Sequence, residues 1–110
     1  MSFFKWDEVP TDELTPQVKR KVVHLENVML VYTEREAGVE MPIHQHPHEQ
    51  VGLVLQGKAE IILGDEKRVI GPGEGYLIPS NMKHGGLVGE EPIILLAVFS
   101  PIRDDFLTEE

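Results

Sequence analysis

Glycine and proline punctuate this chain at short and regular intervals. The 110 residues include 10 Gly and 8 Pro, most of them between short segments rich in β-branched and other apolar residues. Such spacing is typical of an all-β sandwich or barrel. No segment shows a sustained helical period. We therefore predict an all-β domain, with one short helical turn at most, in residues 101–110.

The segments between these interruptions predict nine strands. Gly64 and Asp65 are expected to form a two-residue hairpin turn, since Gly accepts the positive φ that such turns need. The predicted strands are Val18–Leu25, Val28–Glu36, Ile43–His46, Gln50–Gln56, Ala59–Leu63, Lys67–Ile70, Gly75–Ile78, Lys83–Val88 and Ile93–Phe99.

Composition limits the classes of function. A chain of this length is expected to form one domain, and a hydrophobic content of 41% is enough for a packed core. The absence of cysteine excludes thiolate metal sites and a cysteine nucleophile. A net charge of −9 argues against nucleic acid and anionic membranes as partners. The N-terminus has no basic region before a long apolar run, and no apolar stretch reaches about 20 residues, so we expect a cytoplasmic protein.

Two histidines separated by one residue indicate a metal site. In an extended strand His44 and His46 would point to the same face, and imidazole is the commonest side-chain ligand for transition metals. If residues 47–49 form a tight connection, antiparallel pairing would place Gln50 opposite His46. His84 lies 34 positions after Gln50, so local geometry does not place it.

The strand at residues 50–56 is apolar on both faces. Gly52 and Val54 share the face of Gln50, whereas Val51, Leu53 and Leu55 point the other way. A strand with two apolar faces has to be covered on both sides. One cover is the domain's own core, and we expect the other to be a second sheet or a second subunit, which favours a homodimer. The N-terminal residues Phe3, Phe4 and Trp6 are candidates to pack across this interface.

Two spaced motifs resemble those of the cupins. The first is Gly38-x5-His44-x-His46-x3-Gln50-x6-Gly57, and the second is Gly73-x5-Pro79-x-Asn81-x2-His84. The resemblance implies a double-stranded β-helix, or jelly-roll barrel. We expect a single domain over residues 1–110, with a barrel core at about 18–100, an N-terminal arm at 1–17 and a C-terminal tail at 101–110.

The same resemblance implies a ligand set. His44, His46 and His84 match the family's metal-binding histidines, and Gln50 stands where a Glu is usual. A neutral amide leaves the metal with its full charge and makes it a stronger Lewis acid. The expected cofactor is one divalent transition metal, with Zn, Mn, Ni and Fe all compatible with these donors. His48 is expected to support a ligand or face solvent.

A narrower resemblance is to the pectin-degradation proteins among the cupins. Residues 46–50 and 98–107 carry it, and the opening Phe-Phe-Lys-Trp is similar as well. Members of this group linearise unsaturated uronates, which implies a small anionic sugar acid as the ligand. Phe99 and Arg103 match two of the group's residues beside the metal, with Arg103 expected to pair with a substrate carboxylate.

The third of those residues, an Asp, is replaced here by Ala97. Ring opening needs a proton carrier, and alanine cannot act as one. Tyr32, Glu34 or a metal-bound water are the substitutes considered. Three hypotheses therefore remain open: a metal-dependent enzyme acting on sugar acids, a metal-dependent oxygenase, and a non-catalytic module that binds a metal or a sugar.

Overall fold

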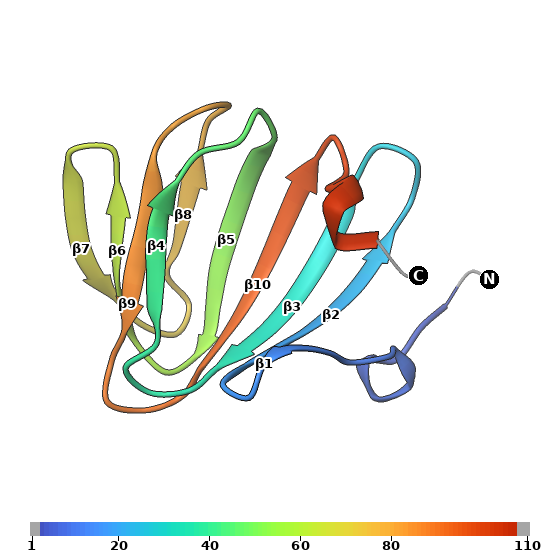
Figure 1. Ribbon diagram of the computed structural model, residues 1–110, viewed down its shortest axis with the longest axis horizontal. Coiled ribbons are helices and arrows are strands. Elements are labelled where there is room, and N and C mark those ends of the chain that lie inside the picture. Colours follow the sequence, from blue (N-terminus) through green and yellow to red (C-terminus); the bar gives the residue numbers. More distant parts are fainter. Residues whose placement is uncertain (1–2, 108–110) are drawn as a thin grey trace.

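The computed structural model describes residues 3–107, which form ten strands in two antiparallel sheets (Figure 1). The larger sheet has the order β1-β2-β3-β10-β5-β8, and the smaller has the order β4-β9-β6-β7. The strands are β1 (Asp12–Thr15), β2 (Val18–His24), β3 (Met29–Arg35), β4 (Glu40–His44), β5 (Glu49–Gln56), β6 (Ala59–Leu63), β7 (Glu66–Ile70), β8 (Gly75–Ile78), β9 (His84–Val88) and β10 (Ile93–Ser100). Two 3-10 helices, η1 (Trp6–Glu8) and η2 (Asp104–Leu107), lie near the ends of the chain.

This architecture confirms the predicted all-β jelly roll. Each of the nine predicted strands is present, and β6 and β8 have the predicted bounds. β1 was not predicted, because Asp12-Glu13-Leu14-Thr15 contains a single apolar residue and shows no alternation; all four residues are exposed. The predicted helical turn near the C-terminus is η2; residues 108–110 of the predicted tail lie outside the described residues.

One predicted strand differs from the structure by more than one residue at each end. The strand predicted over Ile43–His46 begins earlier, at Glu40, and ends at His44. His46 therefore lies in the link between β4 and β5, and these two strands belong to different sheets. The two histidines therefore do not approach each other as alternate residues on one face of a single strand, as expected from the sequence.

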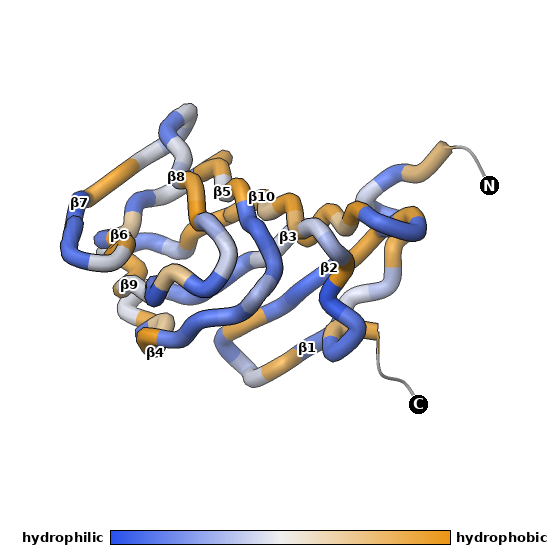
Figure 2. Tube along the Cα trace, turned by 90° about the horizontal axis from the view of Figure 1, so that it is seen from above, coloured by the Kyte–Doolittle hydropathy of each residue, from blue (hydrophilic) through white to orange (hydrophobic). Residues whose placement is uncertain are grey.

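The two sheets enclose the apolar core. Figure 2 looks down on both layers, with β4, β9, β6 and β7 along one side and β8, β5, β10, β3 and β2 along the other. One buried cluster joins the sheets and includes Val54, Ile61, Val88 and Leu95. A second cluster, around Met29, Val31, Ala97 and Phe99, continues to Phe106 of η2. The C-terminal segment therefore packs against the inner face of the larger sheet.

The outer face of the larger sheet is apolar, as the alternation in β5 predicts. Gly52 and Val54 are buried, whereas Val51, Leu53 and Leu55 are 49%, 38% and 44% exposed. Leu77 on the neighbouring strand β8 is 70% exposed. Nothing in residues 3–107 covers these four side chains.

The N-terminal segment covers another part of that outer face. The Trp6 ring packs 5.1 Å from the Tyr32 ring, and Lys21 Nζ donates a 2.7 Å hydrogen bond to the Trp6 carbonyl. Phe3 and Phe4 line a shallow surface with Leu25 and Val28. Neither helix of the described chain is long and apolar enough to cross a membrane.

Gly52 is the position in β5 where a side chain is excluded. A Cβ there would overlap the Tyr76 ring on the neighbouring strand β8. The Gly52→Ala substitution is therefore expected to displace the ring and lower the free energy of unfolding by about 1–3 kcal/mol. Thermal or urea unfolding measures this. Gly71→Ala is the control, because its nearest contact would be an ordinary 3.4 Å to Lys58 Cγ; an equal loss of stability in both variants would contradict the account.

Candidate metal centre

His44 and His84 are brought together by strand pairing in the smaller sheet. β4 and β9 are antiparallel neighbours, and His44 lies directly opposite His84 in their register. Paired residues share a sheet face, so the two rings project to the same side, with their centroids 4.2 Å apart. This pairing supplies the position of His84 that local sequence geometry could not give.

His46 reaches the same point from the link between the sheets. The Asn81 backbone N–H donates a 2.8 Å hydrogen bond to the His46 carbonyl, and Ser80 Oγ donates a 2.7 Å bond to the Pro47 carbonyl. Asn81 has a positive φ of 66°, the left-handed conformation that Asn tolerates better than most residues. The turn between β8 and β9 therefore fixes the link and, with it, the buried His46 ring.

Gln50 comes from the larger sheet. It lies on β5 between Ile78 of β8 and Phe99 of β10. The expectation that antiparallel pairing places it opposite His46 was wrong, because β4 and β5 do not pair. The two side chains nevertheless meet, with Gln50 Oε1 3.2 Å from His46 Nε2.

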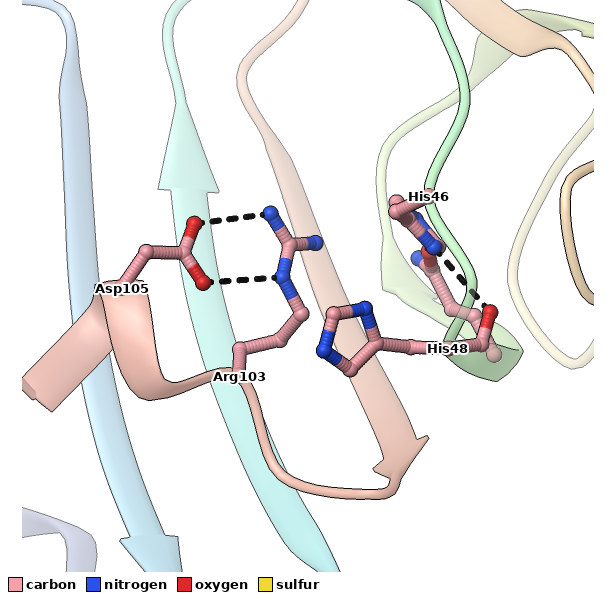
Figure 3. Close-up of polar contacts among 5 residues, drawn as sticks. His46, His48, Arg103 and Asp105 are labelled. Atoms are coloured by element: carbon pink, nitrogen blue, oxygen red, sulfur yellow. Dashed lines mark hydrogen bonds and ion pairs between the residues drawn. The ribbon is translucent and has the colours of Figure 1, made fainter.

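A hydrogen bond from Nδ1 to a backbone carbonyl fixes the orientation of each imidazole ring. His44 Nδ1 lies 2.9 Å from the Pro42 carbonyl, His46 Nδ1 lies 3.0 Å from the His48 carbonyl, and His84 Nδ1 lies 2.9 Å from the Met82 carbonyl. A carbonyl oxygen only accepts, so each Nδ1 carries the proton and each Nε2 presents a lone pair. Figure 3 shows the bond from His46 to the His48 backbone. His44, His46 and His84 form a cluster: each offers one ligand nitrogen, and these three atoms all lie within 4.8 Å of one another.

These tautomers make the contact between His46 and Gln50 informative. With its proton on Nδ1, His46 Nε2 is an acceptor, and the amide oxygen facing it at 3.2 Å is an acceptor too. Two facing lone pairs repel each other, and a cation bound beside them would remove this repulsion. Burial lowers the pKa of both His46 and His84, which favours the neutral rings that bind metals. The donor set thus fits a divalent transition metal.

The buried Tyr76 hydroxyl supports the Gln50 amide. Burial raises the pKa of Tyr76, while the nearby positive charge of Arg35 and a hydrogen bond with Gln50 act in the opposite direction. An amide that bonds the phenol through its nitrogen turns its oxygen toward His46. Outer hydrogen bonds of this kind commonly orient metal ligands.

A cavity of about 290 Å³ lies between the sheets and reaches this cluster. Its lining includes His44, Gln50 and His84, together with Phe99 and Arg103, which the sequence suggested as substrate-binding residues. Ala97 also lines the cavity, between Val31 and Gly52 of the flanking strands. Ala97, the position at which the resemblance implied an acid, therefore faces the cavity.

Arg103, in the segment after β10, lines one side of this cavity. Its Nε and Nη2 donate hydrogen bonds of 3.1 and 2.9 Å to the two carboxylate oxygens of Asp105 (Figure 3). These bonds and the positive charge of Arg103 lower the pKa of Asp105. The guanidinium also lies 5.2 Å from the Phe99 ring centroid. Figure 3 places the His48 side chain between Arg103 and His46.

Two of the considered proton carriers are in the wrong place. Tyr32 and Glu34 alternate with the inward residues of β3 and line a separate outer surface with Lys19 and Lys21. They cannot act at the cavity, because the sheet itself lies between. His24, outside both motifs, is exposed, and its Nδ1 lies 2.9 Å from the Leu25 carbonyl.

Sequence reasoning missed three other residues of the cavity: Arg20, Arg35 and Tyr76. The alternation of residues between the two strand faces could have identified the two arginines. Arg20 shares the face of Val18 and Val22, and Arg35 that of Met29 and Val31, so each cation falls in an apolar row. A charged residue in such a row is often functional.

Comparison with known proteins agrees with this geometry. The family model for the cupin domain matches residues 31–99. The chain belongs to the cupin family. It is 35% identical to the pectin degradation protein KdgF of Dickeya dadantii, over 96% of this chain and 97% of that protein.

Solved structures give the same relationship. KdgF from a Halomonas species superposes with a TM-score of 0.90 and 36% identity, covering 96% of this chain and 99% of that one. An RmlC-like cupin from Shewanella frigidimarina has a TM-score of 0.91 and 25% identity, with 96% of both chains covered. The relationship to the pectin-degradation group inferred from the motifs is thus confirmed.

The histidine cluster is expected to bind one divalent metal per chain. His46→Ala and His84→Ala should each reduce bound metal at least tenfold, since each removes one of a few ligands, and should abolish the rise in melting temperature that metal gives the wild type. Elemental analysis after dialysis measures the first effect and thermal unfolding the second. His24→Ala is the matched control and should keep its metal. Equal metal content in all three variants would contradict the assignment.

Proposed function

We propose that this protein is a metal-dependent enzyme that opens the ring of small unsaturated uronates. The observation that carries the proposal is the cluster of three imidazoles and one amide at a cavity between the sheets that is also lined by arginines. Similarity to KdgF over nearly the whole length of both chains supports the same chemistry.

The proposed reaction is an isomerisation and needs no second substrate. The bond between the anomeric carbon and the ring oxygen breaks as the anomeric hydroxyl loses its proton, which leaves an aldehyde and an enolate. The enolate then gains one proton on carbon to become a ketone. A metal held by His44, His46, His84 and Gln50 would supply Lewis-acid stabilisation of oxygen. The surrounding residues bind and orient the sugar: Phe99 offers an aromatic edge, and the arginines attract an acid.

Ala97 limits the expected rate. No carboxylate lines the cavity among the described residues, so an acid–base group is missing where the resemblance to the pectin-degradation group implies one. General acid–base catalysis contributes about 10²–10⁴-fold to a typical rate. We expect the wild-type protein to turn over slowly and to depend on proton exchange with water.

The test is turnover of a 4,5-unsaturated uronate by the metal-loaded protein. Loss of the ultraviolet absorbance of its conjugated double bond reports the reaction. The wild type should be slow, Ala97→Asp should raise kcat at least tenfold because it restores an acid–base group, and His84→Ala should be inactive.

Three results would contradict the proposal. Absence of turnover in both the wild type and Ala97→Asp, with metal bound, would exclude this reaction. Oxygen uptake with an iron-loaded protein would instead favour the oxygenase, and uronate binding without any turnover would favour the non-catalytic module.

The second subunit is part of the same proposal. The exposed apolar patch made by Val51, Leu53, Leu55 and Leu77 lies on the outer face of the larger sheet, away from the cavity. A twofold contact between two such faces would cover it without blocking the site. The cytoplasmic location stays a prediction from the sequence.

Light scattering during size-exclusion chromatography tests the dimer. The wild type should have twice the chain mass of 12.4 kDa. Leu77→Glu, which places a charge in the patch, should shift the protein to a monomer. Glu66→Lys changes an exposed charge on β7 in the smaller sheet and should leave the dimer intact. A monomeric wild type would refute the proposed interface.

A further inference from the structure

Three arginines line a cavity that contains no acid. Arg20 comes from β2, Arg35 from β3 and Arg103 from the segment after β10, and no Asp or Glu is among the described residues of the lining. The chain as a whole carries 19 acidic residues and a net charge of −9. The concentration of positive charge at this cavity therefore runs against the overall composition.

The three guanidinium groups differ in how they are neutralised. Arg103 makes a two-point ion pair with Asp105. Arg20 has a 4.0 Å contact from Nε to Asp12, and its guanidinium lies 4.0 Å from the Phe106 ring centroid, but its Nε makes no hydrogen bond. Arg35 has no ion pair within residues 3–107, and its Nε is buried without a hydrogen-bond partner.

An unpaired buried cation costs free energy. Burial lowers the pKa of both Arg20 and Arg35. The nearby Tyr76 hydroxyl raises the pKa of Arg35, and the positive charge of Arg20 acts in the opposite direction. A neutral side chain of similar size would remove this penalty. The free-energy cost is recovered when an anion enters the cavity and accepts the free N–H groups.

The strand register separates these cations from the histidine cluster. Thr33 pairs with Arg20 on one side and with Leu95 on the other. Leu95 lies four residues before Phe99, the β10 partner of the candidate amide ligand. Four residues of antiparallel strand span about 14 Å. Allowing for the reach of the arginine side chains, the space between the two ends suits a molecule the size of one sugar.

The side chain midway along this path is the small Ala97, on the same strand face as Leu95 and Phe99. An Asp at that position would place a negative charge between the arginines and the cluster. With alanine, the unneutralised guanidinium groups face the cavity without a competing carboxylate from the chain.

We infer that Arg35, assisted by Arg20, forms the carboxylate-binding subsite of this cavity. The ligand is an acid whose carboxylate accepts hydrogen bonds from these guanidinium groups while its hydroxyl or carbonyl oxygens face the histidine cluster. That the acid is a sugar acid rests on the proposed function. Arg103, which the sequence suggested for the carboxylate, is held by Asp105 and closes the cavity.

Calorimetric titration with two matched sugars tests the subsite. D-galacturonate is a saturated acid with no double bond to isomerise, and D-galactose is its neutral counterpart. Protein loaded with one equivalent of Zn²⁺ should bind the acid at least tenfold more tightly than the neutral sugar. Arg35→Gln should abolish that preference and Arg20→Gln should weaken it severalfold, since bonds to charged groups are among the stronger ones.

Arg68→Gln is the matched control, because it makes the same charge change at an exposed position of β7; it should keep the preference. Arg103→Gln should keep most of it. Thermal unfolding without ligand separates binding from a structural role: Arg35→Gln should melt at the same temperature as the wild type or higher, because it removes an unpaired buried charge.

Three results would overturn the inference. These are a wild type that does not prefer the acid, an Arg35→Gln variant that keeps the preference, and an Arg35→Gln variant that loses binding only because its melting temperature falls. The comparison of acid and neutral sugar can be interpreted even if the turnover test fails, because binding of a saturated acid requires no reaction.

Discussion

The hydrogen bond from each histidine Nδ1 to a backbone carbonyl is the constraint on which the site depends. His44, His46 and His84 are all held this way, so the three Nε2 lone pairs converge and cannot neutralise one another. The Gln50 oxygen adds a fourth acceptor. A bound cation would stabilise such a cluster of acceptors, and three separate segments of the chain supply the ligand atoms around one point.

The fold creates this convergence by using both sheets. The smaller sheet supplies His44 and His84 as a cross-strand pair, the larger sheet supplies Gln50, and the link that crosses between them supplies His46. The turn containing Ser80 and Asn81 fastens that link. Metal binding would therefore hold the two layers together at this end, while apolar packing holds them at the other.

Most of the strands could be predicted from the sequence because alternation and glycine punctuation are local signals. The pairing could not, since nothing local indicates that the chain leaves one sheet after His44 and enters the other at Glu49. The four candidate ligands came from the family motifs, and the parity argument for His44 and His46 gave a correct proximity for a wrong reason. Arg20 and Arg35 were missed, although their positions in apolar rows of β2 and β3 mark them as unusual.

X-ray absorption spectroscopy of the Zn²⁺-loaded protein tests the central claim most directly, because it counts and identifies the atoms around the metal. The account predicts a first shell of three imidazole nitrogens and oxygen at about 2.0–2.2 Å, with outer-ring scattering reduced by one imidazole in His84→Ala. A shell of oxygen atoms without imidazole scattering would contradict the assignment of His44, His46 and His84 as one metal centre.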